Sequence, residues 1–179
     1  MTTLLSTPKG EIIFRFATPE DAVSLLELRL EALTRNPEAF AADVDKSAAD
    51  GAEAWVKLVF DYAKNQSGAV RIACLGAELI GMSGIVRGHW PKTYHSGTIW
   101  GVYVNPDWRG FHIGEGIVKG CVEWAIANDL TVVNLGVIIS NLSAIRCYAR
   151  CGFTIYGIQP KVTYYAGVYY DDLLMVKLI

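Results

Sequence analysis

A run of almost uninterrupted apolar residues, TVVNLGVII at positions 131–139, constrains the fold more than any other segment. Most of its side chains are β-branched, and such a run is typical of a central strand that is covered on both faces. A strand of this kind needs neighbouring strands at its edges and helices on its faces. The chain of 179 residues is about the size of one domain, so we expect a single domain over residues 1–179, with a tail at residues 1–10.

The rest of the chain shows strand and helix patterns in turn. Thr18 and the residues after it carry the signals of a helix start, namely a capping side chain, a proline in the first turn and two acids. We expect strands at residues 11–16, 71–75, 79–86, 97–104, 131–139, 153–158 and 169–178, and helices at residues 19–35, 50–64, 117–128 and 141–151. This order predicts a mixed α/β fold without internal repeats or linkers.

Composition excludes several classes of protein. Hydrophobic residues make up 52% of the chain and charged residues 19%, which is typical of a folded protein rather than a disordered one. The formal net charge of -2 lacks the broad basic field that nucleic-acid binding needs. The cysteines have neither CxxC spacing nor a histidine cluster beside them, so we expect free thiols and no metal site.

No targeting or membrane segment is predicted. The N-terminal sequence has neither the cationic start nor the apolar run of a signal peptide. The most apolar region, residues 130–145, is interrupted by asparagine, serine and glycine, so it does not indicate a membrane span. We therefore expect a cytoplasmic protein whose partners include neither membranes nor nucleic acids.

A glycine-rich segment, WRGFHIGEG at positions 108–116, joins an expected strand to an expected helix. It is not a P-loop, because Gly114 is followed by Glu115 and Gly116 instead of a lysine and a hydroxyl residue. It also lacks the spacing of a dinucleotide fingerprint. The free backbone N–H groups at the start of a helix can bind a diphosphate, but an ordinary corner between a strand and a helix fits this segment equally well.

A second motif follows, and the two together point to a known family. Residues 109–114 read RGFHIG, and residues 141–153 read NLSAIRCYARCGF. The pair closely resembles the GNAT superfamily of N-acetyltransferases, which carries an Arg/Gln-x-x-Gly-x-Gly/Ala turn and a later Asn-x-x-Ala-x-x-x-Tyr-x-x-x-Gly-Phe segment. The resemblance extends over nearly the whole chain from residue 11. It implies an α/β fold with a mixed central sheet of about six to seven strands, helices on both faces, and splayed fourth and fifth strands.

The resemblance implies that acetyl-coenzyme A (acetyl-CoA) binds between these splayed strands. The fourth strand would contact the pantetheine arm, and the glycine-rich turn would hold the pyrophosphate. The implied cofactor-binding residues are Val102, Val104, Arg109, Gly110, Phe111, His112, Ile113, Gly114, Glu115, Asn141 and Tyr148. Helix capping alone is the alternative role for Asn141. No metal is implied.

His112 departs from the family pattern, which has glycine at this position because the main chain lies close to the pyrophosphate. A negative φ would make the histidine harmless, whereas a positive φ is disfavoured for a residue that has a Cβ atom. A charged imidazole beside the diphosphate could strengthen binding. A solvated side chain without a role is the alternative.

The chemistry that the resemblance implies is direct transfer of an acetyl group to a primary amine. Tyr148 matches the family tyrosine that protonates the departing thiolate, and a phenol suits this role because it is protonated at neutral pH. A core tyrosine is the alternative. The fourth strand carries no acid that could serve as general base, so the base stays open among Glu78, His95, Asp171 and relayed water.

The acceptor is not defined by a motif. Acceptor sites of the family lie among the first helices, the loop between the third and fourth strands, and the C-terminal strands, which here read PEAFAADVD, RGHWPKTYH and TYYAGVYYDD. Their aromatic and acidic residues suit a pocket for a cationic amine, but an exposed hairpin edge or a dimer contact fits them equally well, and a homodimer is compatible with the sequence. We expect a small-molecule or amino-acid-like acceptor. The alternatives are acetylation of a protein N-terminus or lysine, and a non-catalytic sensor domain that binds acetyl-CoA.

Overall fold

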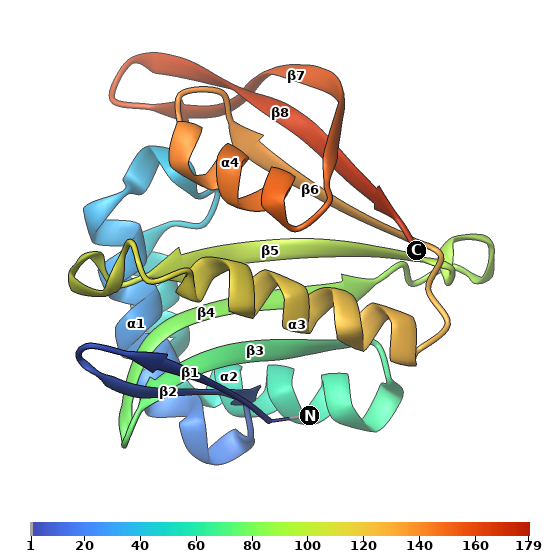
Figure 1. The fold of residues 1–179 in the computed structure, drawn as a ribbon. Helices are drawn as coiled ribbons and strands as arrows, with labels where there is room; N and C mark the ends of the chain where they lie inside the picture. The colour runs from blue at the N-terminus through green and yellow to red at the C-terminus, as the bar shows by residue number, and fades with distance from the viewer. Residues whose placement is uncertain (1) are drawn as a thin grey trace.

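One mixed β-sheet runs through the computed structural model, which describes residues 2–179 (Figure 1). The strands lie in the order β1-β2-β3-β4-β5-β6-β8-β7. Their bounds are β1 Thr3–Thr7, β2 Gly10–Phe16, β3 Gly68–Leu75, β4 Glu78–Arg87, β5 Ser96–Val104, β6 Val132–Ile138, β7 Thr154–Tyr165 and β8 Val168–Leu178. The helices are α1 Ala22–Arg35, α2 Val44–Asn65, α3 Ile113–Ala127 and α4 Leu142–Arg150, with short 3-10 turns at η1 Pro19–Asp21, η2 Pro37–Ala39, η3 Pro91–Thr93 and η4 Pro106–Trp108. The predicted mixed α/β class is confirmed, with slightly more strands than expected.

Strands β5 and β6 run parallel and stay paired over a short length only. Residues 96–98 of β5 lie opposite residues 132–134 of β6. Beyond them β5 continues to Val104 and β6 to Ile138 without pairing with each other. The two strands therefore diverge, as Figure 1 shows, and the predicted splay is confirmed.

Helices cover both faces of the sheet, as the sequence predicts. α3 and α4 lie in front of the sheet in Figure 1, and α1 and α2 lie behind it. Val118 and Cys121 of α3 are fully buried in the front core, while Leu25 of α1 is fully buried in the rear core beside Trp55 of α2. Each buried aliphatic side chain stabilises the fold by about 1.5–3 kcal/mol, which holds these helices on the sheet. Within residues 2–179, no helix combines the length and the apolar character needed to cross a membrane.

A β-bulge in β5 changes the direction of its side chains. Met82 of β4 lies opposite Tyr103 and Gly84 lies opposite Trp100, so β5 has one residue more than β4 over this stretch. Gly101 lies inside the bulge with a φ of 64°, a conformation that glycine adopts without steric strain. Because of the extra residue, Trp100 and Tyr103 both face α1 and α2.

The N-terminal residues belong to the sheet, so the tail predicted for residues 1–10 is wrong for Thr3–Thr7. This segment is β1, which forms an antiparallel hairpin with β2. Leu5 packs against the core cluster that contains Ile12. The sequence TLLST has no regular alternation, so periodicity does not predict a strand there, and pairing with β2 supplies its backbone hydrogen bonds.

Two further elements differ from the sequence prediction. Helix α2 begins at Val44 and not at residue 50, because the Asp43 side chain accepts a hydrogen bond from the backbone N–H of Lys46 at 2.8 Å. Gly51 then interrupts the helical backbone with a φ of 68°, which hides the helical period in the sequence. Strand β6 is covered on one face only: Leu135 is buried, but Gly136 is exposed, since α1 and α2 pack against β3 and β4.

Candidate functional site

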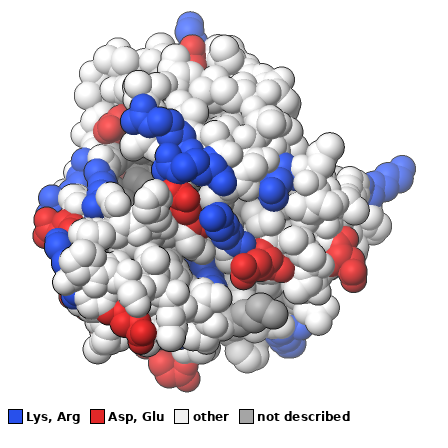
Figure 2. Space-filling view, in the orientation of Figure 1, with Lys and Arg blue, Asp and Glu red and all other residues white. Residues whose placement is uncertain are grey.

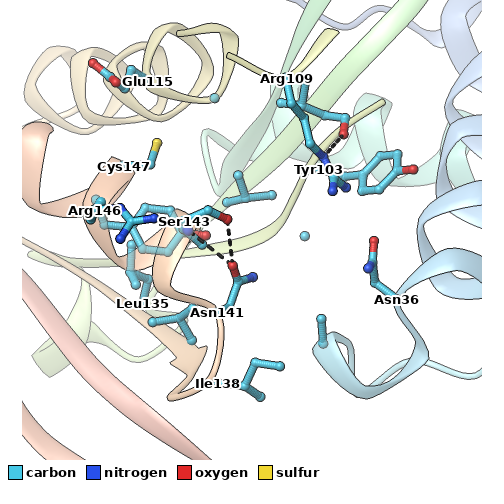
Figure 3. Close-up of a pocket in the computed structure, with 18 of the residues that line it drawn as sticks. Asn36, Tyr103, Arg109, Glu115, Leu135, Ile138, Asn141, Ser143, Arg146 and Cys147 are labelled. Carbon is cyan, nitrogen blue, oxygen red and sulfur yellow. Dashed lines mark hydrogen bonds between the residues drawn. The ribbon is translucent and has the colours of Figure 1, made fainter. Parts of the chain in front are cut away.

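A cavity of about 630 Å³ opens where β5 and β6 diverge (Figure 3). One wall comes from β5 and from the turn that leads into α3, and the other comes from the end of β6 and from α4. The loop between α1 and α2 closes one side. The lining residues are Asn36, Glu38, Ala39, Phe40, residues 99–104, residues 108–110, residues 112–115, residues 135–138, Ser140, Asn141, Ser143, Ala144, residues 146–148 and Arg150.

Almost all of the residues that the sequence singles out for the cofactor line this cavity. These are Val102, Val104, Arg109, Gly110, His112, Ile113, Gly114, Glu115, Asn141 and Tyr148. Phe111 does not line it. Its ring packs beside Trp108, and both rings lie within 6 Å of the Lys9 ammonium. Lys9 belongs to the β1–β2 hairpin, so this hairpin contacts the turn on the side away from the cavity.

The turn before α3 presents backbone donors to the cavity. The first intrahelical bond is from the N–H of Gly116 to the carbonyl of His112, so the N–H groups of residues 113–115 have no partner within the helix. Gly110 has a φ of 87°, and the Arg109 side chain is held by a hydrogen bond from Nε to the carbonyl of Val104 at 3.2 Å. Unpaired N–H groups at the positive end of a helix dipole form a site for an anion.

His112 adopts a positive φ of 60°, so the condition under which the histidine would be harmless is not met. Its ring instead makes a local contact, because Nδ1 lies 2.7 Å from Oε1 of Glu115. Arg150 donates to the same oxygen from Nε at 2.6 Å. Burial opposes ionisation of Glu115, but the hydrogen bonds from His112 and Arg150 outweigh it and lower the pKa of Glu115. An ionised Glu115 therefore ties the start of α3 to α4.

Basic side chains gather around this end of the cavity. Arg146 and Arg150 of α4 and Arg109 of the turn all line it. Figure 2 shows the Lys and Arg side chains collected over α4, the helix that Figure 1 places in front of the diverging strands. The arginines of α4 lie within the second sequence motif, but that motif gives them no role, so sequence reasoning missed this charge.

Two tyrosines line the cavity and differ in their surroundings. The Tyr103 hydroxyl donates to Glu31 of α1 at 3.1 Å, and burial followed by the charge of Glu31 raises the pKa of Tyr103 to about 12. Tyr148 of α4 is also buried, with its ring edge on Phe153, and burial raises its pKa. Its hydroxyl makes no hydrogen bond to any residue within 2–179. Tyr148 is thus a protonated donor with a free O–H.

Asn141 caps α4. Its Oδ1 accepts hydrogen bonds from the backbone N–H of Ala144 at 3.2 Å and from the Ser143 hydroxyl at 3.0 Å (Figure 3). The amide nitrogen of Asn141 makes no hydrogen bond with any described residue. The capping role is therefore present, and the nitrogen stays available for a ligand.

The rear side of the cavity only partly matches the predicted acceptor segments. Asn36 and Phe40, beside the predicted PEAFAADVD segment or within it, line the cavity, and β7 contacts η2. The segment RGHWPKTYH does not line it, because this loop lies where β5 begins and is still paired with β6. None of the candidate bases Glu78, His95 and Asp171 lines the cavity. Within residues 2–179, no cluster of acidic, histidine and cysteine side chains could hold a metal ion.

Comparison with known proteins identifies the family. A model of the acetyltransferase (GNAT) family matches residues 29–153, which is more than half of the chain. No curated protein matches the chain.

Several solved structures share the fold. A GNAT-family acetyltransferase from Streptococcus pneumoniae superposes with a TM-score of 0.79 at 24% identity and covers 94% of this chain and 99% of its own. A ribosomal-protein-S5-alanine acetyltransferase from Vibrio fischeri gives a TM-score of 0.81 at 17% identity, and the match covers 98% of this chain and 96% of that one. An acetyltransferase from Salmonella typhimurium, solved with its cofactor acetyl-CoA, gives a TM-score of 0.76 at 19% identity, and the match covers 93% of each chain.

Proposed function

The chain belongs to the acetyltransferase (GNAT) family and uses acetyl-CoA, and from this premise we propose that it moves the acetyl group directly to a primary amine of a small-molecule or amino-acid-like acceptor. The observation that carries the proposal is the cavity between β5 and β6, which joins a helix start suited to a diphosphate with a buried, protonated Tyr148. The same cavity is also lined by the loop that follows α1, so cofactor and acceptor would meet between the diverging strands.

The cofactor-binding roles follow from donors that the fold leaves unpaired. The N–H groups of residues 113–115 would hold the pyrophosphate, with Arg109 and Arg146 supplying positive charge beside it. Past Thr98 the edge of β5 that faces β6 is unpaired, so the backbone groups near Val102 that point to this edge would bond the amides of the pantetheine arm as an added strand would. The Val104 carbonyl is already held by Arg109, so Val104 would contact the arm through its side chain. The amide nitrogen of Asn141 faces the same space and would donate to that arm.

Acetyl-CoA supplies an activated thioester, and side chains of the protein donate and accept the protons of the reaction. The amine nitrogen bonds to the carbonyl carbon, and the carbon–sulfur bond breaks. Tyr148 donates its hydroxyl proton to the departing sulfur and regains one from the amine or from water. A positioned donor of this kind accelerates the step by about 10²–10⁴-fold. The tyrosinate that would form is disfavoured by burial, so proton return must be rapid.

A panel of acceptors tests this function. The protein is mixed with acetyl-CoA and, separately, with free amino acids, polyamines, aminoglycosides and peptides that carry either a free N-terminus or a lysine, and the released thiol is followed. We expect turnover with at least one small amine. Turnover confined to peptides would instead assign a protein acetyltransferase. Cofactor binding without thiol release would assign a sensor domain.

A further inference from the structure

Two free cysteines lie one helical turn apart at the end of α4, on the side that faces α3. Cys147 lines the cofactor cavity, and a Cβ atom built on Gly114 would lie 3.4 Å from its Sγ atom. Figure 3 shows the Cys147 sulfur pointing from α4 toward the helix that carries Glu115. Cys151 is buried, and its thiol donates to the backbone carbonyl of Glu115 at 3.8 Å. Both thiols therefore contact the segment whose N–H groups are proposed to hold the pyrophosphate.

The two thiols are also hydrogen-bonded to each other. The Cys147 thiol donates to the Cys151 sulfur, which lowers the pKa of Cys151 although burial opposes ionisation, and the charge of Lys119 lowers it further. The same hydrogen bond, together with burial, raises the pKa of Cys147. Because the thiolate is the reactive form of cysteine, the pair joins a stabilised thiolate to a thiol that the cavity exposes.

A disulfide between these cysteines deforms the end of α4. Residues four apart on a helix have Cα atoms about 6 Å apart, which a disulfide spans, but their Cβ atoms must approach from about 5–6 Å to about 4 Å. Cys151 ends the helix and precedes Gly152, which has a φ of 88°, so the deformation falls on the last turn. Strained disulfides are more easily reduced than relaxed ones, so the bond is reversible.

The last turn of α4 is connected to the cofactor site through Arg150. Its Nε atom donates to Oε1 of Glu115 at 2.6 Å, which ties α4 to the start of α3. Closing the turn between the two cysteines moves the backbone that carries Arg150 and weakens this tie. It also draws the Cys147 sulfur away from its place beside Gly114. Both changes disturb the N–H groups of residues 113–115.

We propose that a hydroperoxide oxidises Cys147 and Cys151 to a disulfide, and that this disulfide weakens the binding of acetyl-CoA. The proposal rests on the proposed function, because it adds a regulation of the same cofactor site. Coupling between two events at one site is reciprocal, so bound cofactor disfavours the disulfide by the same factor. The cofactor and the peroxide therefore compete for this end of the cavity.

The oxidation balances as follows for hydrogen peroxide. The pair first loses one proton to water, and the peroxide reaches the Cys147 sulfur through the cavity. This sulfur bonds to one peroxide oxygen while its proton passes to Cys151, the oxygen–oxygen bond breaks, and hydroxide leaves. The hydroxide takes the proton back from Cys151, whose sulfur then attacks Cys147 and expels the second oxygen as hydroxide. With the proton lost at the start, this hydroxide forms water, so two thiols and one peroxide give one disulfide and two waters.

Peptide mapping tests whether the disulfide forms. The protein is treated with hydrogen peroxide, its remaining thiols are alkylated, and it is digested with trypsin without a reductant. Trypsin cleaves after Arg146, Arg150 and Lys161, so the two cysteines lie on separate peptides, CYAR and CGFTIYGIQPK. We expect these peptides to be recovered joined and to separate on reduction. Peptides recovered only apart, as thiols or with oxygen added, would overturn the proposal.

Desulfo-coenzyme A, which has no thiol to react with the oxidant, tests the effect on binding. Its dissociation constant for the oxidised protein should be at least about threefold above that for the reduced protein, the contribution of one partly exposed ion pair. The same ligand, present in excess during oxidation, should lower the yield of joined peptides. Joined peptides with unchanged affinity would overturn the regulation and leave acetyl transfer intact. A reduced protein that does not bind desulfo-coenzyme A would contradict the proposed function as well.

Variants assign the effect to this pair. Diamide joins two thiols without adding oxygen to a single thiol, so proteins with one cysteine of the pair can be compared. Cys147→Ala and Cys151→Ala should each keep their own affinity for desulfo-coenzyme A through the treatment. Cys74→Ala is the matched control, because it removes a buried cysteine of β3, and it should lose affinity as wild type does. A Cys151→Ala protein that loses as much affinity as wild type would contradict the assignment.

Discussion

Nδ1 of His112 lies 2.7 Å from Oε1 of Glu115, at the point where the chain enters α3. The histidine has the left-handed backbone conformation that glycine adopts easily, and among residues with a Cβ atom histidine is one of the more tolerant of it. The backbone N–H groups of the turn therefore point as they would with glycine at this position. The imidazole is held by its contact with the Glu115 carboxylate.

His112→Gly should leave coenzyme A affinity within about twofold, because glycine keeps the same φ and the diphosphate is bound by main-chain donors. The dissociation constants of both proteins, measured between about pH 5.5 and 8, where a histidine changes its charge, should run parallel. If the wild-type affinity alone rises as the pH falls, a charged imidazole contributes to diphosphate binding.

Tyr148→Phe should lower kcat about 10²-fold or more while coenzyme A affinity stays nearly the same, because only the proton donor is lost. Tyr103→Phe is the matched control, since that hydroxyl is bonded to Glu31, and it should reduce kcat much less. Steady-state kinetics and calorimetric binding measure the two quantities. An unchanged kcat for Tyr148→Phe would remove this tyrosine from the mechanism.

Asn141 combines two roles that substitution can separate. Asn141→Ala should lower the free energy of unfolding by about 1 kcal/mol, because α4 loses its cap, whereas Asn141→Ser keeps a capping oxygen and should be nearly as stable as wild type. Both variants lose the amide nitrogen and should bind acetyl-CoA more weakly. If the serine variant binds as well as wild type, Asn141 is a helix cap only. Denaturant unfolding and cofactor titration give the two values.

Stability in acid should depend on Asp21, which accepts two hydrogen bonds of 2.7 Å from Arg15. The Arg15 hydrogen bond lowers the pKa of Asp21 below its ordinary value of 3.8. The ion pair therefore stabilises the fold fully above that pH and is lost as the pH falls through the lower folded-state value. Asp21→Asn should lower the free energy of unfolding by about 2 kcal/mol at neutral pH and flatten its decline in acid. The free energy of unfolding is measured against pH for both proteins. If it declines in parallel for wild type and Asp21→Asn, Asp21 does not contribute to stability in this pH range.

Much of the fold could be predicted because strong local patterns coincide with the elements that bury side chains. The apolar run at residues 131–139 and the helix before Asn36 both appear where the sequence places them. Strand β1 and the first turns of α2 could not be predicted, because hairpin pairing and a capped, glycine-interrupted helix leave no regular period in the sequence.

The cofactor side of the site could also be predicted, since its glycine-rich turn and the Asn141–Phe153 motif are local in sequence. The acceptor side could be predicted only in part. Phe40 of the predicted PEAFAADVD segment lines the cavity, whereas the RGHWPKTYH segment does not, because no motif fixes which loops reach this side. Gly101 was the available signal for the bulge in β5, because a glycine inside an apolar strand often marks a bulge or a close approach.

Mass spectrometry of a reaction with isotope-labelled acetyl-CoA tests the central claim most directly. The account predicts that the label appears on the amine nitrogen of a small-molecule or amino-acid-like acceptor, in amounts equal to the thiol released, and that the protein carries no acetyl group at any time. Label on the protein would contradict direct transfer. Label recovered as free acetate, or cofactor that binds and is never consumed, would contradict the assignment of an N-acetyltransferase.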